Sequence, residues 1–429
     1  MTNARRGVIV CRNGRGLDCS QTSHVGRRRQ RVMRGEDDED AVELAVELDR
    51  LLARRDAETG ALATETLEFV GAVSPEFLFG RAKETAPVNE SIAAPGSFYA
   101  CQGAIAMTME CVGAVYRASA EAMRRRRRER ESSGGACSTS ETSFDATKTT
   151  LCVNGDHGTA WNERKRNLME VFNSDAVSER DRRMAVMDEL AFARVVQSRW
   201  PKAPSAWAHR RWVLNQYESR KGERNAKDTK EAFENELAAC DAAILKKRMN
   251  YVAWSHRAWA LTLLDEDDFA TLDDELRASG ARIKRNVSDY CELHYRTRLM
   301  ARFAARAKSA EYITAIKSDV AFVRELIETH PGRESLWSYL RFLYVQLIAQ
   351  NTESENTLDD EALRFVDKVS GKDGAATLDP SWAENSMATQ RRLGGAFLSW
   401  VRIVLARRQG DSCSPSFVRL TDGFTIDKW

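Results

Sequence analysis

Apolar residues recur along much of the chain at the spacing of a single helix face. Two such sets are Phe233, Leu237, Cys240 and Ile244, and Ile313, Ile316, Val320, Val323 and Ile327. Their steps of three and four residues place the side chains on one stripe of an α-helix. We find no sustained alternation of apolar and polar residues at period two. The body is therefore predicted to be all-α.

Interruptions of this pattern divide the chain. We expect an opening helix at residues 41–55, a second at 98–123 and a closing helix at 382–408, where Gly394-Gly395 allows a kink or break. The run Arg124–Arg128 is interpreted as a helix end that leads into a solvated Ser-rich stretch. The predicted segments are a disordered basic/acidic tail (1–40), an N-terminal helical extension (41–123), a flexible Arg- and Ser-rich insertion (124–152), helical repeats (153–350), closing helices (351–410) and a tail (411–429).

One short motif, a tryptophan followed three residues later by an arginine, recurs along the body. The copies are Trp161–Arg164, Trp207–Arg210, Trp254–Arg257, a degraded copy Leu293–Arg296, and a weaker copy that starts at Trp337 and has Leu340 in place of the arginine. The first residues of successive copies are 46, 47, 39 and 44 apart. This spacing leaves room for one further helix and two turns, so five antiparallel helix pairs are predicted to stack into an array.

The residue types of the motif suit packing between helices. A tryptophan buries a large flat ring. The arginine lies one turn further on the same side, where its fork can pair with a carboxylate of an adjacent helix or donate to carbonyl groups. His209 and His256 lie two residues after their tryptophans and are expected to point elsewhere, toward a groove or a neighbour. Packing within the array is the alternative role for each of these residues.

Charge is distributed unevenly along the chain, and this distribution argues against one class of function. Residues 1–35 contain nine Arg and the single acid Asp18, a local balance of +8, so the rest of the chain carries −6 of a formal net charge of +2. The basic start is interpreted as a disordered tail, with an organelle transit peptide as the alternative. A mildly acidic body argues against a nucleic-acid partner.

Candidate metal and catalytic motifs are lacking. The nine Cys form no CxxC pair and the six His form neither HxxxH nor HExxH, so reduced thiols and no metal site are predicted. The most apolar stretch, 98–116, contains Gln102 and Glu110, and no membrane span is expected. There is no GxSxG, P-loop or GxGxxG motif, which disfavours a self-contained enzyme. The acidic run 265–268 is interpreted as a solvated turn in preference to a magnesium site.

Two motif copies with their lead-in residues resemble the signature of protein prenyltransferase α subunits. They read Pro201-Lys202-Ala203-Pro204-Ser205-Ala206-Trp207-Ala208-His209-Arg210 and Asn250-Tyr251-Val252-Ala253-Trp254-Ser255-His256-Arg257. The stretches TAWNERK (159–165) and NVSDYCELHYR (286–296) are similar to the repeat-containing branch of this family. The resemblance covers about residues 155–350.

The resemblance implies a right-handed superhelical array of antiparallel helix pairs that wraps around a separate β subunit. That subunit would carry the zinc, the prenyl diphosphate cavity and most catalytic contacts, so this chain is expected to hold no cofactor. The implied partner is a Rab geranylgeranyltransferase-type β subunit. The implied activity is cytoplasmic transfer of a geranylgeranyl group to a C-terminal cysteine of a protein substrate.

The resemblance also implies roles for single residues. Lys202 matches a lysine that reaches the prenyl diphosphate, where an ammonium would offset charge on the departing group; an exposed lysine after a proline is the alternative. Asn250 and Tyr251, with His209 and His256, are candidate substrate-binding residues. Three departures favour the atypical branch over farnesyl-type chemistry. They are Ala203-Pro204 in place of Asn-Tyr, Val252 in place of a His, and Leu340 in place of the last motif Arg.

Two functions from other classes stay open at this point. A helical-repeat scaffold for a different protein partner would share the fold, and the lead-in lysine and Asn-Tyr argue against it. An RNA-binding helical repeat is disfavoured because its units are shorter and its concave face is basic.

Overall fold

The computed structural model describes residues 38–56, 61–70, 98–101, 104–132, 144–220, 226–264, 268–305, 309–350, 355–371 and 380–408. Residues 71–97 of the predicted N-terminal extension and the predicted tail 411–429 lie outside these ranges. The chain forms two compact units, Met1–Lys221 and Gly222–Trp429, and each is described by itself.

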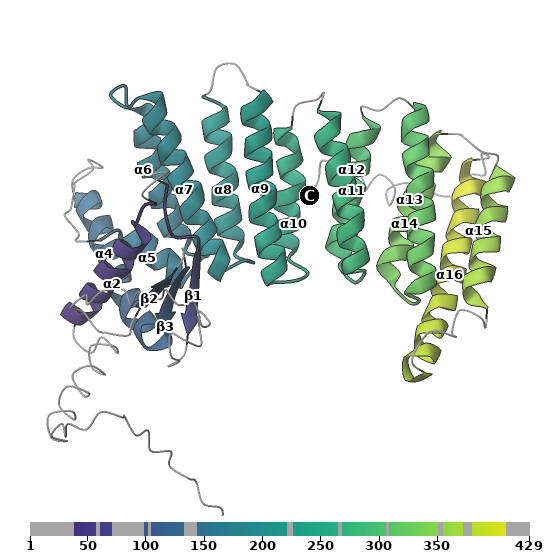
Figure 1. The fold of residues 1–429 in the computed structure, drawn as a ribbon, viewed down its shortest axis with the longest axis horizontal. Helices are drawn as coiled ribbons and strands as arrows, with labels where there is room; N and C mark the ends of the chain where they lie inside the picture. Colours follow the sequence, from purple (N-terminus) through teal and green to yellow (C-terminus); the bar gives the residue numbers. More distant parts are fainter. Residues whose placement is uncertain are drawn as a thin grey trace, which may run out of the picture. The chain divides into compact units, whose positions relative to one another are not determined.

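The first unit begins with three helices around a shared apolar core. They are α2 (Asp38–Leu52), α4 (Met109–Ser132) and α5 (Ala146–Val153), which pack on one another (Figure 1). The core between them includes Leu44, Leu48, Cys111 and Val115, all fully buried. The opening helix predicted at 41–55 is confirmed, because its apolar residues face this core.

A small sheet adjoins these helices. Its strands are β1 (Thr66–Val70), β2 (Phe98–Cys101) and β3 (Ala104–Thr108), in the order β1-β3-β2. β1 runs parallel to β3, with Leu67 opposite Ile105, and β2 runs antiparallel to β3. Ser198 of α7 (Glu179–Arg199) accepts a 2.8 Å hydrogen bond from the amide of Leu67 through its hydroxyl oxygen, which fixes the sheet to that helix.

One prediction for this region is wrong. The helix expected at 98–123 starts only at Met109, because the preceding apolar residues form β2 and β3; a short apolar run does not distinguish a buried strand from a buried helix. The run Arg124–Arg128 lies in the last turns of α4, as expected of a helix end, although the helix continues beyond it to Ser132. Arginine is a good helix former, and ion pairs one turn apart (Arg125–Glu129 and Arg127–Glu131) support the last turns. The division into six segments stays a prediction.

Helix pairs make up the rest of both units. In the first unit α6 (Gly158–Asn173) follows α5, and α8 (Pro204–Glu218) follows α7. The second unit contains α9 (Ala226–Lys246), α10 (Tyr251–Ala260) with a 3₁₀ turn η1 (Leu261–Leu263), α11 (Phe269–Arg285), α12 (Tyr290–Ala304), α13 (Ser309–Thr329), α14 (Glu334–Gln350), α15 (Glu355–Ser370) and α16 (Pro380–Arg408). The predicted all-α repeat architecture is confirmed.

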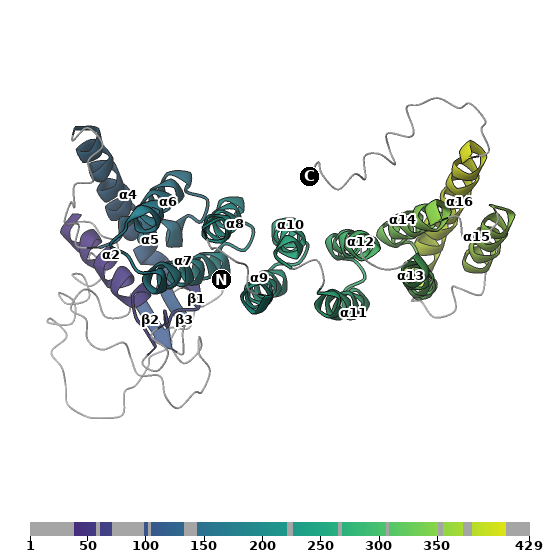
Figure 2. The same cartoon turned by 90° about the horizontal axis from the view of Figure 1, so that it is seen from above.

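The second unit has two rows of helices. Figure 2 shows α10, α12 and α14 in one row and α9, α11 and α13 in the other. Successive members of the first row pack on one another, and each also packs on the helix that precedes it in the chain. The apolar stripes predicted on α9 and α13 supply buried residues such as Phe233, Ile316 and Val323.

The last helix is continuous through Gly394-Gly395, where a kink or break had been considered. A Cβ on Gly394 would lie 3.1 Å from Cγ1 of Val366. Gly394 therefore serves close packing of α16 on α15. The predicted closing helix is confirmed over 380–408.

Candidate functional site

Five helix pairs share one turn length. In α5–α6, α7–α8, α9–α10, α11–α12 and α13–α14 the second helix begins after a turn of four residues, which are 154–157, 200–203, 247–250, 286–289 and 330–333. The last turn residue is the N-cap in each pair whose cap is defined, for example Asn250 and Asp289. The first residue of each motif copy, a tryptophan in every pair except α11–α12, lies four residues after that position. Equivalent residues can therefore be compared directly between pairs.

The motif tryptophans are buried and hydrogen-bonded. Trp161 Nε1 donates to the Gly155 carbonyl at 2.9 Å, and Trp207 Nε1 donates to the Pro201 carbonyl at 3.0 Å. Both acceptors are the second residue of the turn before the helix. The ring thus holds the turn against the helix that follows, which is the packing role predicted for these residues.

The motif arginines join one helix pair to the next. Arg164 of α6 donates two hydrogen bonds to Glu189 of α7, at 2.8 and 2.5 Å. Arg257 of α10 does the same to Glu275 of α11 at 2.9 and 3.1 Å. Arg296 of α12 pairs with Asp319 of α13 at 2.8 and 2.6 Å. Each is a buried two-pronged pair between consecutive helix pairs, which confirms the predicted geometry of the arginine fork.

A second arginine contact stays within the pair. Nη1 of Arg210, Arg257 and Arg296 donates to the carbonyl of Leu190, Leu237 and Leu276, respectively. The acceptor lies 20 residues before the arginine each time. Each arginine that makes both contacts thus fixes the helix before it and the helix after it.

The residue before the arginine also bonds to a carboxylate, and for both histidines this carboxylate lies on a neighbouring helix. His209 Nε2 lies 2.7 Å from Glu189, and His256 Nε2 lies 2.6 Å from Glu236. Tyr339 donates its hydroxyl to Asp319. Each carboxylate precedes its partner by 20 residues. These side chains point back to their own pair, where Nε2 of each histidine and the hydroxyl of Tyr339 have a carboxylate partner.

Burial controls the ionisation of this network. Desolvation raises the pKa of Glu189, but Arg164 and His209 outweigh it and hold the pKa well below its usual range. Burial lowers the pKa of His209 although Glu189 acts in the opposite direction. The neutral imidazole therefore donates its Nε2 hydrogen to an ionised carboxylate.

Lys202 lies on an exposed edge of the first unit. It is the third residue of the turn before α8, a position held by Asp156, Met249, Ser288 and Gly332 in the other pairs. Its ammonium forms no ion pair with any residue that the structure describes. The neighbouring N-cap, Ala203, makes no side-chain cap bond. Asp156 instead accepts from the Ser205 amide at 3.0 Å.

The Asn-Tyr lead-in separates into a buried and an exposed residue. Asn250 is fully buried and caps α10 by accepting from the Ala253 amide at 3.3 Å. Tyr251, the first residue of α10, has 60% of its surface exposed, and Tyr290 at the same position of α12 has 54%. Because α10 and α12 pack side by side, the N-terminal edge of this row presents two aromatic side chains to solvent.

The candidate site residues fall into two classes. Lys202 in the first unit and Tyr251 in the second are accessible, whereas Asn250, His209 and His256 are buried. Burial favours the packing role that was the alternative for the two histidines. Sequence reasoning missed the carboxylates Glu189, Glu236, Glu275 and Asp319. Each of these acids is followed by Leu or Val and lies 20 residues before a His-Arg, Tyr-Arg or Tyr-Leu dipeptide. This fixed spacing is the sequence signal that could have identified them.

Two further features are absent from the described ranges. No group of three or more His, Cys, Asp or Glu side chains there has an arrangement that would hold a metal ion. Within the same ranges, no helix is both long and apolar enough to cross a membrane.

Comparison with known proteins agrees with this geometry. The family described as "Protein prenyltransferase alpha subunit repeat" matches residues 186–217, 233–264 and 316–347. These stretches correspond to α7–α8, α9–α10 and α13–α14. The chain is 28% identical over 244 residues to "Protein prenyltransferase alpha subunit repeat-containing protein 1" of Danio rerio, covering 48% of this chain and 54% of the relative.

More distant relatives carry an activity in their names. "Geranylgeranyl transferase type-2 subunit alpha" of Saccharomyces cerevisiae is 22% identical over 168 residues, 39% of this chain and 49% of the relative. The chain thus spans about half the length of the curated relatives it matches. The predicted family resemblance is confirmed: three stretches of the chain match protein prenyltransferase alpha subunit repeats, and the chain is similar to proteins named for these repeats.

Proposed function

We propose that this chain is the α-type subunit of a heterodimeric protein prenyltransferase that transfers a geranylgeranyl group to a protein cysteine in the cytoplasm. The observation that carries the proposal is the exposed Lys202 at the start of α8, the second helix of a recognised repeat. On this proposal a separate β subunit holds the zinc and the prenyl chain. This chain supplies a scaffold and one cation.

Lys202 has the right chemistry for that contribution. Lys202 directly precedes the N-cap of α8, and the helix dipole adds positive potential at this end of the helix. A diphosphate leaving group gains negative charge as its bond to the prenyl carbon breaks. A cation that meets it there stabilises the transition state more than the ground state, which raises the rate and not only the affinity. Tyr251 and Tyr290 would contribute exposed aromatic area to the partner or to the protein substrate.

The test is co-expression of the chain with a Rab geranylgeranyltransferase-type β subunit, size exclusion, and transfer of a labelled geranylgeranyl group to a protein pool. We expect a 1:1 complex, and a Lys202→Ala complex with kcat lowered about 10- to 100-fold. Lys202→Arg should retain part of the rate, because it retains the charge. Lys230→Ala, at an exposed lysine of α9, is the matched control and should leave kcat unchanged.

A second candidate is a non-enzymatic scaffold with the same fold. The observation that favours it is the departure at Ala203-Pro204, which removes the cap and the exposed tyrosine found at the equivalent positions of α10. If the β subunit does not co-elute, or if the complex transfers nothing, the scaffold function replaces the prenyltransferase one.

A further inference from the structure

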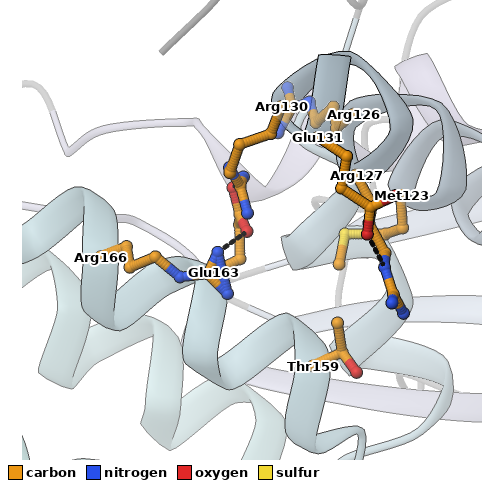
Figure 3. A pocket seen from close by; sticks show the side chains of 8 residues that line it. All are labelled: Met123, Arg126, Arg127, Arg130, Glu131, Thr159, Glu163 and Arg166. Carbon is orange, nitrogen blue, oxygen red and sulfur yellow. Dashed lines mark hydrogen bonds and ion pairs between the residues drawn. The ribbon is translucent and has the colours of Figure 1, made fainter. Parts of the chain in front are cut away.

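The arginine run on α4 contributes to a pocket that the proposed function does not use. The pocket has a volume of about 230 Å³ and lies between the last turns of α4 and the first turns of α6 (Figure 3). Its charged lining consists of four arginines and two glutamates: Arg126, Arg127, Arg130, Arg166, Glu131 and Glu163. The lining therefore has a net charge of +2.

Two carboxylates face four guanidinium groups in this lining. Glu163 is buried and accepts from both Arg130 and Arg166, the latter at 3.0 Å. One carboxylate therefore faces two guanidinium groups. Arg127 uses only its Nε for Glu131, at 2.8 Å, and Arg166 uses only its Nη1 for Glu163, among the contacts made by described residues. Their remaining N–H groups are available to a ligand.

The other arginines of the run have a different role. Arg125 pairs with Glu129 at 2.9 Å, and Arg128 pairs with Glu121 at 2.8 Å. Neither lines the pocket. These side chains give an internal control, since their exposure is similar to that of Arg127 on the same helix and they lie outside the pocket.

We propose that this α4–α6 pocket binds a phosphoryl dianion. A phosphate or phosphomonoester carries a charge close to −2 at neutral pH, which matches the pocket, and its oxygens suit the planar guanidinium fork. Thr159, in the first turn of α6, adds a hydroxyl and places the ligand near the positive end of a helix dipole. Met123 gives one wall an apolar surface, so the pocket takes a compact group and not an extended chain.

The test is equilibrium dialysis of ³²P-labelled inorganic phosphate against the full chain at constant ionic strength. Arg127→Gln/Arg166→Gln removes two ligand contacts and leaves Arg130 to pair with Glu163; both side chains are at least half exposed, so the fold is retained. We expect affinity to fall about tenfold or more. Arg125→Gln/Arg128→Gln removes the same charge outside the pocket and should change affinity less than twofold. Glu131→Gln should raise affinity severalfold, a gain that misfolding cannot produce.

A second arm identifies the source of the phosphoryl group. A phosphoserine peptide that binds at least tenfold more tightly than inorganic phosphate, with the same dependence on the variants, assigns the pocket to a phosphorylated protein. Equal affinity assigns it to free phosphate. Absence of saturable binding at millimolar phosphate overturns the proposal. Equal losses of phosphate affinity in the two double variants would also overturn the proposal. The same holds if acetate displaces bound phosphate as effectively as sulfate does.

Discussion

The buried pair between Arg296 and Asp319 offers a direct test of how the array is held together. Arg296 is 6% and Asp319 4% exposed, and two hydrogen bonds of 2.8 and 2.6 Å join them across α12 and α13. Removing either partner leaves the other charge buried. We therefore expect Arg296→Met and Asp319→Leu each to lower the free energy of unfolding by about 3–5 kcal/mol.

The double variant should be much less damaged than the two losses together predict. With both charges removed, the remaining cost is the unsatisfied hydroxyl of Tyr339 and the carbonyl of Leu276, about 1–3 kcal/mol. The coupling energy is the difference between the loss in the double variant and the sum of the two single losses, and here it amounts to several kcal/mol. This exceeds the coupling energies of contacting residues that include no buried charge. Tyr339→Phe alone keeps the ion pair and should cost only about 1 kcal/mol.

Urea unfolding followed by circular dichroism gives the stabilities, because urea does not screen charge as guanidinium does. Hydrogen exchange of peptides from α12 to α14 localises the effect to this interface. For a unit of about 200 residues, a loss of 3–5 kcal/mol corresponds to a fall in Tm of roughly 6–20 °C. Strict additivity of the two single variants would refute the reasoning, since it would mean that the two side chains stabilise the fold independently.

Three further variants test other features. Ala203→Ser supplies the missing cap of α8 and should raise the free energy of unfolding by about 0.5–1 kcal/mol in a thermal melt; a loss would show that this buried position has no room for a hydroxyl. Burial raises the pKa of Glu292 from 4.5 to about 7 although Arg282 acts in the opposite direction. Between pH 4.5 and pH 7 the native state therefore holds a proton on Glu292 that the unfolded state has released. The free energy of unfolding of the wild type falls as the pH rises through this range. The free energy of unfolding of Glu292→Gln should rise relative to that of the wild type by up to about 3 kcal/mol between pH 5 and pH 8. Parallel pH profiles of stability for the two proteins would contradict this. Gly155→Ala should lower Tm, because its Cβ would lie 2.8 Å from Cβ of Trp200; an unchanged Tm would show that the turn can shift freely.

Local periodicity was sufficient to predict the helices and the repeat. Successive residues of the stripes on α9 and α13 lie about one helical turn apart, as do the tryptophan and the arginine of the motif, and at this distance spacing determines which side chains share a face. The recurrence of the motif then predicted the pairing of helices. The same reasoning failed where two structures suit one composition, as in β2 and β3, whose apolar residues were assigned to a helix.

The histidines show why the site was harder to predict than the fold. His209 and His256 carry no local sign of their partners, because Glu189 and Glu236 lie on another helix. Spacing on one helix says nothing about such contacts. Lys202 was found only through resemblance, since an exposed lysine after a proline has no pattern of its own; its catalytic role stays a prediction.

The constant interval inside each helix pair has a consequence for how the chain tolerates changes of length. The acid and its His or Tyr partner are always 20 residues apart, whereas the arginine and the next acid are separated by 25, 18 or 23. One residue inserted within a turn such as 200–203 would therefore displace every bond of that pair. Residues inserted between pairs would leave these bonds in place, because the separation between the arginine and the next acid already varies. Whole pairs, and not single helices, are the segments that can be exchanged, duplicated or grafted in this protein.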